Sequence, residues 1–105
     1  MSKKEVRQRF RDSVFGRDQY RCKSCGYKST VNTLDAHHVT PREEMPNGGY
    51  VAENGISLCP QCHIEAEAYL KGDESKPDFA PVVLYELIGS SYEKAVAASE
   101  KLNEG

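Results

Sequence analysis

Two pairs of cysteines and three histidines are the residues whose types and spacing could do chemistry in this chain. Cys22 and Cys25 form one C-x-x-C unit, and Cys59 and Cys62 form another. Four thiolates are the ligand set of a tetrahedral structural zinc site. The 33 residues between the pairs exceed the roughly 15–20 of a compact zinc ribbon, so further structure must lie between them. Redox-active pairs or disulfides are the alternatives, but no βαβ thioredoxin pattern surrounds either pair.

The three histidines lie within or beside the segment that such a zinc site would clamp. His37 and His38 are adjacent there, and His63 directly follows the second cysteine pair. His63 and Glu67 are four residues apart and would share one face of a helix. With a histidine from a neighbouring strand, they would form an open site for a divalent metal, with positions left for water and a phosphate oxygen. A solvent-facing Glu67 is the alternative interpretation of that residue.

Adjacent histidines on one regular strand would point to opposite faces. His37 and His38 can therefore serve one site only if their strand ends or twists, and Pro41 favours such an ending.

Local patterns predict the elements that must position these residues. At the N-terminus, Ser2 and Glu5 fit a capping box for a helix over residues 2–15, and the tripeptide from Gly16 should end it. An apolar stripe on that helix comprises Val6, Phe10 and Val14. A polar, turn-rich stretch follows over 20–33, and a strand over 34–39. A loop over 42–55 contains an Asn47-Gly48-Gly49 turn. A second strand is expected over 56–59, and a helix begun by Pro60 over 60–71.

The C-terminal third contains a linker, a short apolar segment and a final helix by its sequence pattern. Gly72 suits the position after a helix, and residues 73–81 have the composition of a linker. A short apolar segment over 82–88 follows. Ser90 and Glu93 then offer a second capping box, for a final helix whose packing side would comprise Ala95, Ala98 and Leu102.

Length and composition favour a single domain over the 105 residues. We expect it to divide into a basic N-terminal helix over 1–16, a zinc-stapled core over 17–72 and a C-terminal helical extension over 73–105. No apolar run is long enough for a membrane span, and the N-terminus lacks the pattern of a signal peptide. The expected location is the reducing cytoplasm, where cysteines serve better as metal ligands than as disulfides.

The net charge of −2 hides an asymmetry between the two parts of the chain. Residues 1–30 carry nine lysines and arginines against three acidic residues, whereas the remainder carries five against thirteen. A basic end on an acidic body suits contact with phosphates. A solvated helix face is the alternative explanation.

Taken together, the motifs resemble the HNH endonuclease family over roughly residues 13–70. The residues that carry the resemblance are Cys22-x-x-Cys25-Gly26, Asp35-x-His37-His38-Val39-x-Pro41, Asn54 and Cys59-x-x-Cys62-His63. The resemblance implies an α+β fold: a small ββα-metal core of two antiparallel strands and a helix, stapled by zinc and flanked by the terminal helices.

The resemblance also implies roles for individual residues. His38 resembles the general base, while His37 and His63 match the ligands of the catalytic metal. Asn54 matches the residue that fixes the loop and helps to orient the base. Glu67 occupies a position where family members often carry one more ligand.

The resulting expectation is a metal-dependent endonuclease that hydrolyses phosphodiester bonds in DNA. Mg²⁺ or Mn²⁺ is the expected catalytic ion, although imidazole ligands also suit Ni²⁺, Co²⁺ and Zn²⁺. Arg7, Arg11 and Arg42 are candidates for backbone contacts. A homodimer or a partner protein could supply target specificity, and phage packaging, restriction or mobile-element use are compatible roles. The alternative is a non-catalytic zinc module that binds nucleic acid or protein.

Overall fold

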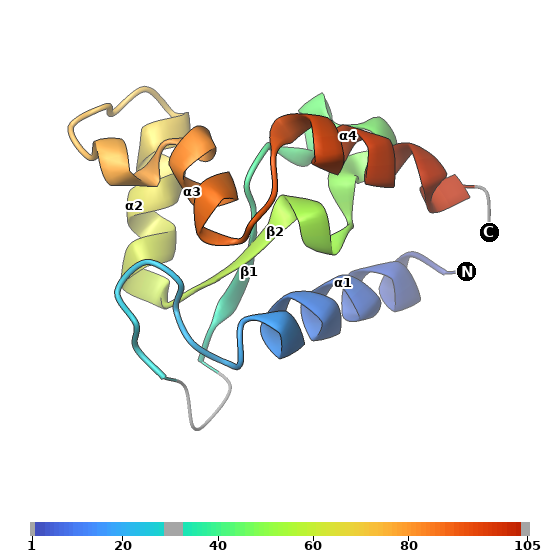
Figure 1. Ribbon diagram of the computed structural model, residues 1–105, viewed down its shortest axis with the longest axis horizontal. Coiled ribbons are helices and arrows are strands. Elements are labelled where there is room, and N and C mark those ends of the chain that lie inside the picture. The colour runs from blue at the N-terminus through green and yellow to red at the C-terminus, as the bar shows by residue number, and fades with distance from the viewer. Residues whose placement is uncertain (1, 29–32, 104–105) are drawn as a thin grey trace.

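The computed structural model describes residues 2–28 and 33–103, so part of the predicted turn-rich stretch over 20–33 lies outside the described residues. Helices and a two-stranded antiparallel sheet make up the fold, which confirms the α+β class. In chain order the elements are α1 (Lys3–Arg17), β1 (Asp35–His38), β2 (Gly55–Leu58), α2 (Pro60–Leu70), α3 (Pro81–Leu87) and α4 (Tyr92–Glu100). The two strands pass between α1 and α2 (Figure 1). Within the described part of the chain, no helix is both long and apolar enough to cross a membrane.

The two strands of the sheet pair antiparallel along their whole length. Asp35 pairs with Leu58 at one end of the ladder, and His38 pairs with Gly55 at the other. All four residues of β2 are buried, because α1 covers the sheet with Phe10 and Val14. Both strands are within one residue of the predicted bounds.

Helix α1 begins as predicted but ends later. The Ser2 hydroxyl accepts a hydrogen bond from the Glu5 backbone N–H at 3.2 Å, which confirms the cap. The helix ends at Arg17, within the tripeptide predicted to end it but two residues beyond the predicted limit at residue 15. The Arg17 guanidinium donates to the Gly55 carbonyl at 2.6 Å, and Asp18 accepts from the Ser57 backbone N–H at 2.9 Å. These long-range bonds hold the end of α1 against β2.

The loop between the strands contains three short 3₁₀ turns: η1 (Arg42–Glu44), η2 (Pro46–Gly49) and η3 (Ala52–Asn54). The predicted turn at Asn47 is present, with φ of 54°, 82° and 67° at Asn47, Gly48 and Gly49. Gly49 must be glycine for a second reason, because a Cβ there would lie 2.6 Å from the Asn54 Nδ2 atom.

The C-terminal third folds back over this loop, where α4 packs against η2 and η3 (Figure 1). The predicted linker contains a 3₁₀ turn, η4 (Pro77–Phe79), and the apolar segment after it is α3. The predicted capping box at Ser90 is wrong. The N-cap is Ser91, whose hydroxyl accepts from the Lys94 backbone N–H at 3.1 Å, so Glu93 does not occupy the third helical position.

Candidate functional site

The four cysteines lie together although they come from two distant segments. All are free thiols, and their sulfur atoms lie within 4.8 Å of one another. The Cys25 and Cys59 sulfurs are 3.7 Å apart, close to the separation of about 3.8 Å that follows from four Zn–S bonds of 2.3 Å in a tetrahedron. The cluster therefore has the geometry of a structural zinc site.

Burial and neighbouring groups shift the pKa values of Cys22 and Cys62 in opposite directions. Burial raises the pKa of the Cys22 thiol, but backbone hydrogen bonds, chiefly from Cys25 and Cys59, outweigh it and lower that pKa to about 7. Burial and the neighbouring sulfurs of Cys59 and Cys22 raise the pKa of Cys62 instead. Four thiolates therefore need a bound positive charge to coexist here.

The first cysteine pair is anchored to the sheet by its own backbone. Gly26, with φ of 82°, donates its N–H to the Cys22 carbonyl at 2.9 Å, and the Lys23 N–H donates to the Ser57 carbonyl at 2.9 Å. The second pair stands at the start of α2, where Cys59 is the N-cap. An ion held by all four sulfurs would thus join the segment after α1 to the start of α2.

A second group of candidate ligands includes two residues of α2, His63 and Glu67. His37, His63 and Glu67 offer ligand atoms within 4.8 Å of one another. The same Glu67 oxygen lies 3.4 Å from His37 Nδ1 and 3.3 Å from His63 Nε2. Donors bound at about 2.1 Å in a tetrahedron are separated by about 3.4 Å, so these three atoms could share one ion.

His37 is deeply buried, with 2% of its surface exposed. Its Nε2 atom has no hydrogen-bond partner among the described residues, and a buried imidazole of this kind must be neutral or bind a ligand. Burial, followed by the positive charges of His63 and His38, lowers the pKa of His37 to about 3. A neutral imidazole is the form that binds metal.

Asp35 is a member of this group whose role the sequence analysis missed. Its Oδ2 atom lies 2.9 Å from His63 Nδ1, which leaves Nε2 of that ring toward Glu67. A carboxylate behind a metal-binding histidine fixes the ring and increases its basicity. The spacing held the signal, because Asp35 and His37 are two residues apart on one strand and must point to the same face.

His38 is the last residue of β1 and borders the same cavity. The cavity measures about 330 Å³, and its walls include His37, His38, His63 and Glu67. The His38 ring stacks on Phe10 at 4.6 Å and meets the edge of Tyr50 at 4.8 Å between ring centroids. Burial, followed by the Arg42 charge, lowers the pKa of His38 to about 4, so its imidazole is neutral at physiological pH.

A comparison with protein families agrees with this geometry. The family model for the HNH endonuclease family matches residues 22–68, which contain all four cysteines, the three histidines and both strands. This match covers less than half of the chain, and we refer to residues 22–68 as the HNH domain. No curated protein and no solved structure matches the chain.

Within the HNH domain, Asn54 is a buried structural link rather than a wall of the histidine cavity. Its side chain accepts from the Thr40 backbone N–H and donates to the Thr40 carbonyl, both at 3.0 Å. Its backbone carbonyl accepts from the Val39 N–H at 2.9 Å. Asn54 therefore holds the backbone that directly follows His38.

Tyr85 completes this link from outside the matched segment. Its hydroxyl donates to Asn54 Oδ1 at 2.8 Å and lies 2.7 Å from the Thr40 hydroxyl oxygen. The sequence analysis missed Tyr85, since only folding brings α3 against the HNH domain.

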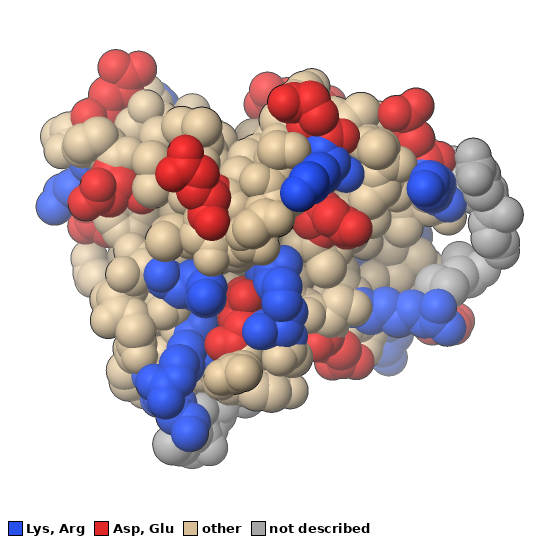
Figure 2. Space-filling view, in the orientation of Figure 1, with Lys and Arg blue, Asp and Glu red and all other residues tan. Residues whose placement is uncertain are grey.

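The three arginines proposed for substrate contact differ in position. Arg42 borders the histidine cavity, whereas Arg7, on α1, lines a second cavity that Arg42 also borders. Arg11 instead covers the Phe15 ring, 5.4 Å from its centroid, and borders neither cavity described here. In Figure 2 basic side chains gather over α1 and the segment after it, and acidic ones over the C-terminal helices.

Proposed function

We propose that the chain is a metal-dependent endonuclease that hydrolyses phosphodiester bonds in DNA. The observation that carries the proposal is the gathering of His37, His63 and Glu67 around one point, with His38 on the wall of the same cavity. A reducing cytoplasm would keep the cysteines available for zinc.

His37, His63 and Glu67 would hold the divalent metal, and Asp35 would keep the His63 ring in position. When bound, the metal would supply Lewis-acid stabilisation of the phosphate and of the leaving oxygen. The carboxylate suits Mg²⁺ or Mn²⁺, while the two imidazoles also suit Ni²⁺, Co²⁺ and Zn²⁺.

His38 would act as the general base. Its Nε2 atom is buried and has no hydrogen-bond partner among the described residues, so Nδ1 would be the nitrogen that accepts a proton from a water in the cavity. Its neutral state leaves that nitrogen free to do so. The stack on Phe10 and the contact with Tyr50 hold the ring in place, while Asn54 acts as a positioning residue through the backbone.

A non-catalytic zinc module is the second candidate, since the four cysteines and the basic helix suit either function. The histidine group favours the enzyme. A module that only binds would have no use for three ligand atoms gathered around one point beside a further histidine.

A plasmid-nicking assay separates the two candidates. We expect the wild-type protein to cut the plasmid with Mg²⁺ or Mn²⁺. Cutting should stop when the catalytic ion is chelated and the zinc is retained. The cutting rate of His38→Ala should be lower by about 10²–10⁴-fold. Gln61→Ala, at an exposed position on α2, is the control. If the wild-type protein cuts the plasmid with none of the metals, the non-catalytic binding module is the function that remains. A folded His38→Ala variant that cuts at the wild-type rate would exclude His38 as the base.

A further inference from the structure

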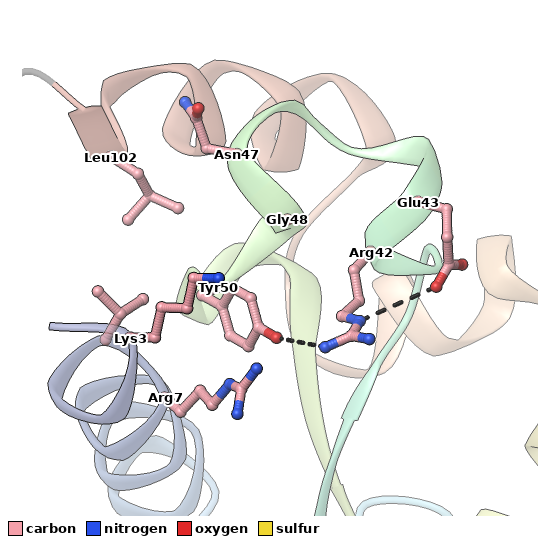
Figure 3. Close-up of a pocket in the computed structure, with 9 residues that line it drawn as sticks. Lys3, Arg7, Arg42, Glu43, Asn47, Gly48, Tyr50 and Leu102 are labelled. Carbon is pink, nitrogen blue, oxygen red and sulfur yellow. Dashed lines mark hydrogen bonds and ion pairs between the residues drawn. The ribbon is translucent and has the colours of Figure 1, made fainter.

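A second cavity adjoins the histidine cavity and has no role in the mechanism above. It measures about 520 Å³ and lies between α1, the η2 turn and the C-terminal turn η5 (Lys101–Asn103). Its walls include three basic side chains, from Lys3, Arg7 and Arg42, and one aromatic ring, from Tyr50. Figure 3 shows Arg7 reaching in from α1 and Arg42 from η1, on either side of the Tyr50 hydroxyl.

The charge of this cleft is largely uncompensated. Arg42 donates to the Tyr50 hydroxyl at 2.9 Å and lies 3.9 Å from the carboxylate of Glu43, the one acidic residue of the cavity wall. In the ranges that the structure describes, neither Lys3 nor Arg7 forms an ion pair. Three cations against one carboxylate, in a concave site, favour an anionic ligand.

The walls are also apolar in part. Val6 and Leu102 line the cleft beside the Tyr50 ring, and Gly48 packs so closely on that ring that a Cβ there would lie 2.8 Å from it. A simple inorganic anion would use only the basic side chains. A nucleotide would use both, with its phosphate on the cations and its sugar or base against the apolar wall.

The cleft is continuous with the site of the chemistry. Arg42 and Glu43 border both cavities, and the Tyr50 ring lies against His38, with centroids 4.8 Å apart. A strand that places one phosphate among the histidines would therefore lead its neighbouring nucleotides past Arg42. Lys3 and Arg7 lie outside residues 22–68, so this part of the cleft is an addition to the HNH domain.

We infer that this cleft binds a nucleotide that flanks the scissile phosphate of a nucleic acid strand, with Lys3, Arg7 and Arg42 as its phosphate contacts. The inference rests on the proposed function for the identity of the ligand. Such contacts add affinity without reading sequence. The cleft would thus set how the strand lies across the histidine cavity.

A binding experiment tests the cleft without turnover. The His38→Ala protein is titrated with a fluorescein-labelled DNA duplex of about 16 base pairs, over salt from about 50 to 200 mM. Adding Arg7→Ala or Lys3→Ala should weaken binding about three- to tenfold and reduce the salt slope by about one. Arg9→Ala is the matched control. Arg9 lies two residues after Arg7, which places it about 200° around the same helix, and it does not border the cleft.

Equal losses for Arg7→Ala and Arg9→Ala would overturn the inference, since the helix would then contribute only its general positive field. A loss of affinity for Arg7→Ala with an unchanged salt slope would also overturn it, because no phosphate contact would have been removed.

Hydrolysis separates this inference from the proposed function. Bis(p-nitrophenyl) phosphate has no flanking nucleotide, so Arg7→Ala should reduce kcat/KM for the duplex at least about fivefold more than for this small diester. Equal losses on both substrates would assign Arg7 to the fold or the metal site and overturn the cleft. Wild-type protein that hydrolyses neither substrate refutes the proposed function, while the binding titration still decides whether the cleft holds DNA.

Discussion

Replacing Asp35 with asparagine tests whether the carboxylate behind His63 sets the strength of the metal site. The change keeps the size and shape of the side chain but removes its negative charge. In the structure, Asp35 Oδ2 lies 2.9 Å from His63 Nδ1. The amide could keep the ring in place, so the main loss should be the charge that makes Nε2 a stronger donor.

The structure sets the size of the effect. Loss of such a carboxylate costs about 10–100-fold in metal affinity or activity. Here the side chains of Asp35 and His63 are 45% and 30% exposed, so solvent screens part of the interaction. We therefore expect the lower limit, a loss of about tenfold in Mn²⁺ affinity, which is about 1.4 kcal/mol.

Isothermal titration of zinc-loaded protein with Mn²⁺ measures this effect. Asp78→Asn, which removes an exposed carboxylate in η4, should bind Mn²⁺ like the wild type. Glu67→Gln, which changes a proposed direct ligand, should lose more than Asp35→Asn. If Asp35→Asn binds Mn²⁺ within about twofold of the wild type, the reasoning from the hydrogen bond is wrong. A similar loss in Asp78→Asn would show that only net charge matters.

Three further predictions follow from the packing. Cys25→Ser should lose zinc and unfold, because the binding free energy of structural zinc, on the order of 10 kcal/mol, exceeds the net stability of an ordinary domain; a zinc-free variant with wild-type circular dichroism would contradict this. Tyr85→Phe should lower the free energy of unfolding by about 1–2 kcal/mol, since the buried Asn54 oxygen loses a donor, and an unchanged urea midpoint would refute it. Gly55→Ala should cost about 1–3 kcal/mol, because its Cβ would lie 2.6 Å from the Phe10 ring, and thermal melting measures the loss.

Much of the candidate site could be predicted from the sequence, because its candidate ligands follow local rules. The C-x-x-C spacing brings two sulfurs of each pair to one side, and the spacing of four puts His63 and Glu67 on one helix face. Pro60 and Gly72 mark the limits of α2 almost to the residue. Each of these patterns depends on neighbours within one or two turns of chain.

The contacts that the sequence analysis missed cross long stretches of chain. Tyr85 reaches Asn54 over 31 residues, and the longer end of α1 depends on a bond from Arg17 to Gly55 over 38 residues. No spacing rule predicts such pairs, because they depend on how completed helices pack on the sheet.

The amino-acid sequence alone thus determined the candidate ligands, the ends of most elements and the family resemblance, since backbone geometry converts short spacings into shared faces. Only the tertiary structure decided which groups share a cavity. Packing of α1 brought Phe10 under His38 and opened the basic cleft beside it. The physical reason is that burial and close approach arise between elements distant in sequence, and the distances among them are set only once the core is packed.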